Sequence, residues 1–221
     1  MAQILLSKQA SSVWAIRKCL HTIKAKFVAN RPGTDTLILL FLVMGLNIHL
    51  LGVGSGYSTI FVPSAVRAGE WWRLFTHPFV HATWYHLILD AGAFFILYAE
   101  LNNRSVLSRI LCISICAGAG LAAGIFFSPL MEVQGLCGLS GTAHGLMAYS
   151  GLATMKEGKH GWMGFISFLL VVAKSIYELF TGVVFFDFLH MGLCGTPVAA
   201  CHFGGVSGGI VSFVILARKR P

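Results

Sequence analysis

"GLCGLSGTAHGLMAYSG", residues 135–151, sets Ser140 among glycines and places His144 one helical turn after it. Serine and glycine are ordinary packing residues where helices meet in a membrane, so this stretch by itself favours close packing. A serine with a histidine nearby is also the pairing that activates a hydroxyl for nucleophilic attack. The remainder of the chain must decide between a packing role and a chemical role for Ser140.

The composition is that of a membrane protein. Of the 221 residues, 56% are hydrophobic and 11% are charged, and the mean hydropathy is +0.77. Soluble domains carry about 25% charged residues, so a chain with several membrane spans is expected. The length suits one compact bundle of about six spans with roughly 20 residues each, and it leaves no room for a second folded domain.

Apolar segments and the charges beside them predict the topology. The expected spans are 36–54, 84–101, 106–127, 139–155, 162–182 and 197–217. Basic residues gather on one side of these spans, which the positive-inside rule assigns to the cytoplasm. We therefore predict an all-α, six-helix membrane domain over 36–217. A basic N-terminal segment (1–35) and a basic tail (218–221) would both be cytoplasmic.

The net charge of +8 does not indicate nucleic-acid binding. Six of the sixteen Lys and Arg residues precede residue 32, and three more close the chain. They flank hydrophobic segments, and no basic face is interleaved with aromatic residues for stacking on bases. We expect a multi-pass protein of a bacterial inner membrane. An organelle transit peptide has a composition similar to that of the N-terminal segment, so an organellar membrane stays open.

Residues 55–83 form an unusual loop, too interrupted to span a membrane and too aromatic for an aqueous linker. Trp71 and Trp72 suit the depth of the membrane interface. Glu70 and Arg73 stand three residues apart and could pair on one helical face. We predict that this first loop is embedded in the outer interface and packs against the bundle.

The six cysteines lack the CxxC pairing of a metal site, so they predict no bound metal. Cys137 and Cys194 both fall in expected outer loops. A disulfide between them is possible, but its geometry cannot be derived from sequence.

Ionisable side chains within membrane spans mark a function or an ion pair. Ser140 and His86 begin two spans that are entered from the outside, and Asp90 lies one turn deeper than His86. His202 lies about one and a half turns into a third such span. At a rise of 1.5 Å per residue, all four lie within roughly 10 Å of the outer boundary. Their shared depth predicts a water-accessible cavity that opens outward.

These residue types support serine chemistry. A neutral histidine is the usual base that takes the serine proton. The oxyanion formed by attack on an amide needs preset donors, and the Ser140 N–H and the His86 imidazole are the candidates. Gly138 and Gly141 allow a tight turn and a close approach of the substrate backbone.

Two features favour structure over catalysis. "HFGGVSGG" holds Gly205 and Gly209 on one helical face, as in close helix packing. Lys174 and Glu178, four residues apart, favour an internal ion pair that faces the bundle rather than a catalytic role.

Three separated motifs together resemble the rhomboid intramembrane serine proteases: "EWWRLFTHPFVHATWYHLILD", "GLSG" and "CHFGGVSGG". The resemblance extends from about residue 36 to the end of the chain. It implies a six-helix bundle with a membrane-embedded first loop and no cofactor. It also implies that Ser140 is the nucleophile, that His202 is the base and that His86 helps to hold the oxyanion.

Two residues depart from the rhomboid pattern. Asp90 stands where rhomboids usually have an asparagine, and an ionised carboxylate would repel an oxyanion. It could remain protonated or orient a histidine. His144 stands where rhomboids commonly place a tyrosine that packs under the catalytic histidine. His144 could alternatively be the base, with His202 in support. "GLSGTAHG" and "AKSIYELFTG" look like the rhombosortase branch, whose members are thought to process GlyGly-CTERM sorting tails.

The predicted function is an intramembrane serine endopeptidase with a Ser140–His202 dyad, which cuts single-pass membrane segments near their outer face. Its partners would be these segments and the bilayer, and the sequence carries no signal for an oligomeric state. One alternative is a non-catalytic rhomboid-like protein that binds or escorts membrane segments. A proton path in a small transporter is a third, and the gathering of ionisable groups near one face argues against it.

Overall fold

The structure is a computed structural model that describes residues 33–101, 103–158, 160–185, 188, 191, 194 and 198–217. The basic segments expected at the two ends, residues 1–32 and 218–221, lie outside the described residues. The chain divides into two compact units, residues 1–37 and 38–221. The second unit holds nearly all of the described residues and carries the candidate site.

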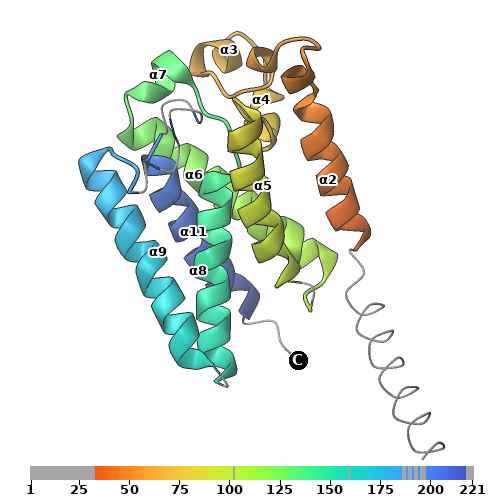
Figure 1. Cartoon of the computed structure of the whole chain (residues 1–221). Helices are drawn as coiled ribbons and strands as arrows, with labels where there is room; N and C mark the ends of the chain where they lie inside the picture. Colours follow the sequence, from red (N-terminus) through yellow and green to blue (C-terminus); the bar gives the residue numbers. More distant parts are fainter. Residues whose placement is uncertain are drawn as a thin grey trace, which may run out of the picture. The chain divides into compact units, whose positions relative to one another are not determined.

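Long α-helices make up most of this unit, and within the described ranges the backbone forms no β-strand beyond an isolated bridge between Phe61 and Leu136. Helix α11 packs against α6, α8 and α9, and α5 packs against α8. Figure 1 shows these helices running alongside one another, with the short helices gathered at one end of them. The long helices are α5 (Trp84–Ala99), α6 (Val106–Phe127), α8 (Ser140–Glu157), α9 (Gly161–Thr181) and α11 (Ala200–Ala217).

The first expected span, 36–54, is shorter in the structure. Helix α2 (Thr34–Leu46) ends before a 3-10 turn, η1 (Ile48–Leu51). The Asn47 side-chain amide donates to the Val43 carbonyl at 2.7 Å and to the Phe79 carbonyl at 2.6 Å. Gly52 then adopts a left-handed φ of 81°, a conformation that glycine reaches without strain. The chain therefore leaves the helix eight residues before the expected end of the span.

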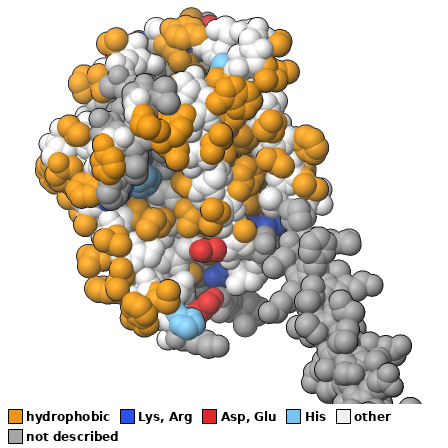
Figure 2. All heavy atoms as spheres, in the orientation of Figure 1, with side chains coloured by type: hydrophobic (Ala, Val, Ile, Leu, Met, Phe, Trp, Pro, Cys, Tyr) orange, Lys and Arg blue, Asp and Glu red, His pale blue; other side chains and the backbone are white. Residues whose placement is uncertain are grey.

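Among the described residues, helices that could cross a membrane are fewer than the expected spans. By length and composition, α6 and α9 can cross a bilayer. Residues 73–79 and α5, bent by 92° at a short break, count as a third span if they are taken together. Helices α2 and α11 are apolar but shorter, so a count of six spans stays a prediction. Figure 2 shows hydrophobic side chains over much of one face, with scattered charged groups chiefly in the lower part of the view, as expected for a surface that meets lipid.

Glycines bring α11 against its neighbours. A methyl group at Gly205 would overlap the Gly141 carbonyl of α8, and one at Gly209 would overlap the Gly145 carbonyl. A methyl group at Gly204 would strike the Ala119 carbonyl of α6. The backbones therefore approach more closely than any other residue type permits. This confirms the prediction of close packing from "HFGGVSGG".

The first loop folds into short helices held by Arg73. Its guanidinium binds the Glu70 carboxylate, with Nε donating to Oε2 at 2.9 Å, so the predicted pairing is confirmed. The same group donates to the carbonyls of Tyr57 at 2.5 Å and Ile60 at 2.8 Å. The loop is thus an ordered part of the fold. Its helices are η2 (Gly56–Ser58), α3 (Pro63–Arg67), α4 (Arg73–Thr76) and η3 (His77–Phe79).

A further short helix, α7 (Leu130–Gln134), follows α6 and meets the loop through an exposed ion pair. Arg67 donates through both of its terminal nitrogens to the two Glu132 carboxylate oxygens, at 3.2 and 3.1 Å. This hydrogen bonding lowers the pKa of the Glu132 carboxyl and raises that of Arg67. Cys137 and Cys194 are both described, and no disulfide joins them.

Candidate active site

Ser140 and His202 meet where α8 and α11 approach each other. Ser140 is the first residue of α8, and His202 lies in the first turn of α11. The His202 Nε2 atom is 3.1 Å from the Ser140 Oγ atom. His202 is buried. The structure therefore brings together the two residues that were predicted to form a nucleophile and its base.

The second nitrogen of His202 binds a carboxylate that was not predicted to reach it. Nδ1 lies 2.7 Å from Glu178 Oε2. A carboxylate only accepts, so Nδ1 carries the proton and donates it to Glu178. In the neutral ring, Nε2 then accepts from the Ser140 hydroxyl. This is the tautomer that a general base requires.

Glu178 is fully buried. Three groups in the described part of the chain donate to its carboxylate. Besides His202, these are the Lys174 ammonium at 2.5 Å and the Phe185 N–H at 2.9 Å, both on Oε1. The predicted Lys174–Glu178 ion pair is therefore confirmed, while the contact with His202 was missed. The sequence offered one signal for this contact. Glu178 lies near the end of α9, and because α9 runs back along α8, that end is expected at the level of Ser140, the first residue of α8.

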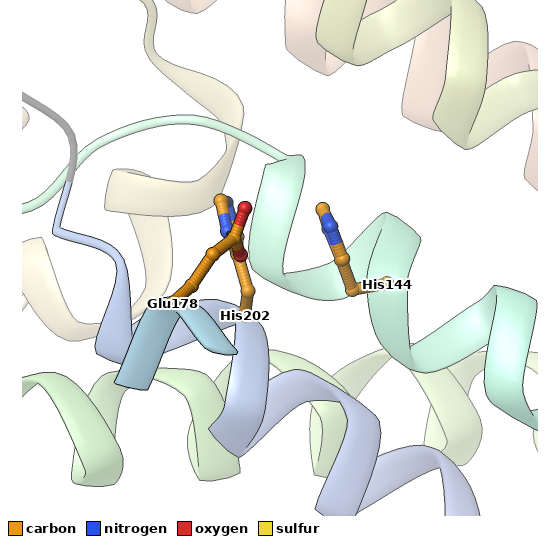
Figure 3. Close-up of side chains that lie close together, drawn as sticks. All are labelled: His144, Glu178 and His202. Carbon is orange, nitrogen blue, oxygen red and sulfur yellow. The ribbon is translucent and has the colours of Figure 1, made fainter. Parts of the chain in front are cut away.

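His144 stacks on His202, with ring centroids 4.0 Å apart and an interplanar angle of 12°. Its Nδ1 atom donates to the Ser140 carbonyl at 2.7 Å, so its Nε2 atom accepts from the Lys174 ammonium at 2.9 Å. Both ring nitrogens thus have partners other than the Ser140 hydroxyl. Figure 3 shows His144, Glu178 and His202 converging from three different helices.

Asp90 occupies the place to which the two expected oxyanion donors point. The Asp90 Oδ2 atom accepts from the Ser140 N–H at 3.0 Å and lies 3.1 Å from His86 Nε2. The His86 Nδ1 atom accepts from the Ala82 N–H at 3.3 Å, which leaves the ring proton on Nε2, directed at Asp90. Asp90 also faces the His81 Nε2 atom at 3.7 Å. The same Asp90 oxygen therefore accepts from both the Ser140 N–H and the His86 Nε2–H.

Gly138 makes this convergence possible. It has a φ of +101°, a conformation that side chains disfavour. A methyl group there would lie 2.7 Å from Asp90 Oδ2 and 2.8 Å from His86 Nε2. The predicted role of Gly138 as the tight turn before Ser140 fits this geometry.

A cavity of about 770 Å³ is lined by five of the candidate residues, which are His86, Asp90, Ser140, His144 and His202. Its wall combines Ser140, His202 and Asp90 with apolar side chains such as Leu89 and Val198. Its volume falls in the range of pockets that enclose a drug-sized ligand. Burial in the same wall raises the pKa of the Cys137 thiol to about 11, so this thiol stays protonated near neutral pH.

His144, Glu178 and His202 are also residue types that bind metals, and one ligand atom of each lies within 4.8 Å of the others. These atoms already have partners. The Lys174 ammonium contacts His144 Nε2 and Glu178 Oε1, and His202 Nδ1 donates to Glu178. A metal ion would have to displace both the ammonium and the ring proton, so the donor set favours a hydrogen-bonded network.

Comparison with protein families matches the rhomboid domain to residues 68–219. The matched range contains Ser140, His202, Glu178 and both oxyanion-donor candidates. A search of curated proteins finds no match to the chain. Together with its apolar helices, the family match makes this an integral membrane protein. The chain belongs to the rhomboid family, whose members are generally intramembrane serine proteases.

Proposed function

We propose that this protein is an intramembrane serine endopeptidase with Ser140 as its nucleophile and His202 as its base. The observation that carries the proposal is the 3.1 Å contact between His202 Nε2 and Ser140 Oγ, in a chain of the rhomboid family. His202 is buried and Ser140 is half-buried, and both line the same cavity, which supports reaction with a peptide bond drawn out of the bilayer.

In the first step, the Ser140 hydroxyl proton passes to His202 Nε2 while Oγ bonds to the scissile carbonyl carbon. The tetrahedral oxyanion then collapses, the C–N bond breaks, and the proton on Nε2 goes to the leaving amine. In the second step, water attacks the acyl–Ser140 ester and gives one proton to Nε2. The C–Oγ bond breaks, and Ser140 regains the proton from His202.

The oxyanion would be held by the Ser140 N–H and by His86 Nε2–H. Both donors are aimed at one point, which supports this assignment, but the Asp90 carboxylate oxygen occupies that point. Asp90 must therefore move away or take up a proton before the oxyanion can form. Either change removes the repulsion between two negative charges.

The substrates would be single-pass membrane segments, cut near their outer face. A helix has to unwind to present its scissile carbonyl, and glycine or proline lowers that cost by about 1 to 3 kcal/mol per residue. GlyGly-CTERM sorting tails would suit such a site, and they would place the protein in the rhombosortase branch. We further propose a bacterial inner membrane with both termini in the cytoplasm.

A serine-directed fluorophosphonate tests the proposal on the purified full-length protein. Wild type should be labelled on Ser140, and Ser140→Ala should not be labelled, because the alanine has no oxygen to attack phosphorus. Mass spectrometry of the labelled peptide identifies the site. Label that persists in Ser140→Ala would refute the nucleophile assignment.

Replacing Asp90 by asparagine should leave cleavage at the wild-type rate or raise it. The neutral amide is nearly the same size and no longer opposes a developing oxyanion. Turnover of a membrane segment in detergent or liposomes measures the effect, with Glu132→Gln as the control for removing an acid elsewhere. Abolition of turnover in Asp90→Asn alone would mean that Asp90 acts as an anion.

The occupied oxyanion position also favours a second candidate, a non-catalytic protein that binds or escorts membrane segments. With both donors satisfied internally, such a protein would bind a segment without cutting it. Wild type that binds segments but neither takes the fluorophosphonate nor cleaves would support this alternative.

A further inference from the structure

We infer that Glu178 positions the His202 base, so that the site works as a Ser140–His202–Glu178 triad instead of the dyad expected from sequence. The inference rests on the proposed serine protease function and names a residue beyond it. Glu178 would act through His202 and would not touch the substrate.

The first argument is burial. Glu178 has no exposed surface, and an ionised carboxylate in that position is costly unless it is fully bonded. Its two oxygens take three donors, and one of these is the catalytic imidazole at 2.7 Å. A residue needed only for packing would not require an acid here.

The second argument concerns orientation. A neutral imidazole carries one ring proton, and only the tautomer with that proton on Nδ1 leaves Nε2 free to accept from Ser140. The Glu178 carboxylate selects this tautomer because it accepts from Nδ1–H. The stacked His144 ring holds the plane of His202 from one face. The tautomer of His202 and the orientation of its ring are therefore both fixed before the substrate binds.

The third argument is charge. When His202 takes the Ser140 proton, the ring becomes an imidazolium inside a buried site. The Glu178 carboxylate stabilises that positive charge more than it stabilises the neutral ring, which lowers the barrier and not merely the ground state. Among the residues that the structure describes, the other charged or titratable groups around this ring are Lys174 of α9, His144 of α8 and Asp90 of α5.

Lys174 neutralises the buried charge of Glu178 and also contacts His144. Its ammonium bonds both Glu178 Oε1 and His144 Nε2. It compensates the buried carboxylate and fixes the ring that stacks on His202. Lys174 therefore affects His202 only through Glu178 and His144. The effects of replacing Lys174 and Glu178 on activity should then not be additive.

Glu178→Gln tests the inference, read as the rate of fluorophosphonate labelling at saturation and as kcat and KM for a membrane segment. We expect the maximal rate and kcat to fall about 10² to 10⁴-fold, in line with the loss of the triad acid in soluble serine proteases. KM and the labelling half-saturation should be unchanged, because Glu178 does not contact substrate. Glu132→Gln, the same chemical change in an ion pair on the surface, should match wild type.

Glu178→Gln leaves the Lys174 ammonium without its carboxylate partner, which could itself impair folding. A double-mutant cycle separates that folding defect from a loss of catalysis. Lys174→Met alone should lose less activity than Glu178→Gln. The double variant, in which both buried charges are gone, should lose no more than Glu178→Gln alone, because both residues act through His202.

Two results would overturn the inference. One is wild-type kcat in folded Glu178→Gln, and the other is recovery of wild-type kcat in the double variant. Each would leave the proposed function standing, since wild type and Glu132→Gln would still label on Ser140. Failure of wild type itself to label would instead refute the proposed function.

Discussion

Replacing His202 by alanine should lower the turnover of a membrane segment by about 10⁴ to 10⁶-fold, close to the effect of removing the nucleophile. In the proposed mechanism His202 Nε2 is the base, and it lies 3.1 Å from Ser140 Oγ. Without it, the serine proton has no acceptor at the moment of attack. Cleavage of a membrane segment in liposomes, followed by gel or mass spectrometry, measures the loss.

His144 provides the matched comparison, because its ring lies parallel to that of His202 and is also near Ser140. His144→Phe keeps an aromatic ring under His202 and removes both ring nitrogens. We expect it to retain activity within about a hundredfold, because it loses two supporting hydrogen bonds of about 0.5–1.5 kcal/mol each, and neither of them is to the Ser140 hydroxyl. If His144→Phe were inactive while His202→Ala remained active, the base would be His144.

Replacing Gly205 by alanine should be among the most damaging single changes outside the catalytic residues. Its new methyl group would overlap the Gly141 carbonyl, directly beside Ser140 in α8. Neither backbone can yield without separating α8 from α11. Overpacking of this kind costs about 1 to 3 kcal/mol of unfolding free energy, and a shift of about 1 Å in a reacting group can cost 10²-fold in rate.

Gly118→Ala in α6 is the control, because nothing lies within 4 Å of the added methyl group. Alanine is favoured over glycine within a helix by about 1 kcal/mol, so Gly118→Ala should equal or exceed wild type in stability. Thermal unfolding in detergent and cleavage rate should be measured for both variants. Wild-type stability and rate in Gly205→Ala would show that the helices do not depend on this contact.

The main features of the site could be predicted from the chain because the rise of a helix is constant. Residue number, once a span is recognised, converts to depth. Ser140, His86 and His202 were placed at one depth on this basis, and the structure brings all three to the same cavity. The Glu70–Arg73 pair was predictable for a similar reason, since residues three apart share a helical face.

The role of Glu178 could not be derived in the same way. Depth along a helix says nothing about the direction in which a side chain points around it. The ion pair between Lys174 and Glu178 is a local property of α9 and was recognised as such. Whether that pair faces lipid, a neighbouring helix or His202 depends on how α9 is rotated against α8 and α11.

The position of Asp90 also could not be predicted from the sequence. From the sequence, a carboxylate four residues after His86 could be protonated or could orient a histidine. The structure places one of its oxygens between the Ser140 N–H and His86 Nε2. Gly138 allows this placement, because any side chain there would collide with both groups.

The sequence alone determined the membrane class, the order of the apolar segments, the glycine faces and the height of each polar group along its own helix. These are properties of composition and of the helical repeat within a single segment. Only the tertiary structure decided which carboxylate binds which ring: Glu178 behind His202, and Asp90 at the oxyanion position. The physical reason is that helix rotation and separation are set by contacts between segments, above all the glycine contacts between α8 and α11.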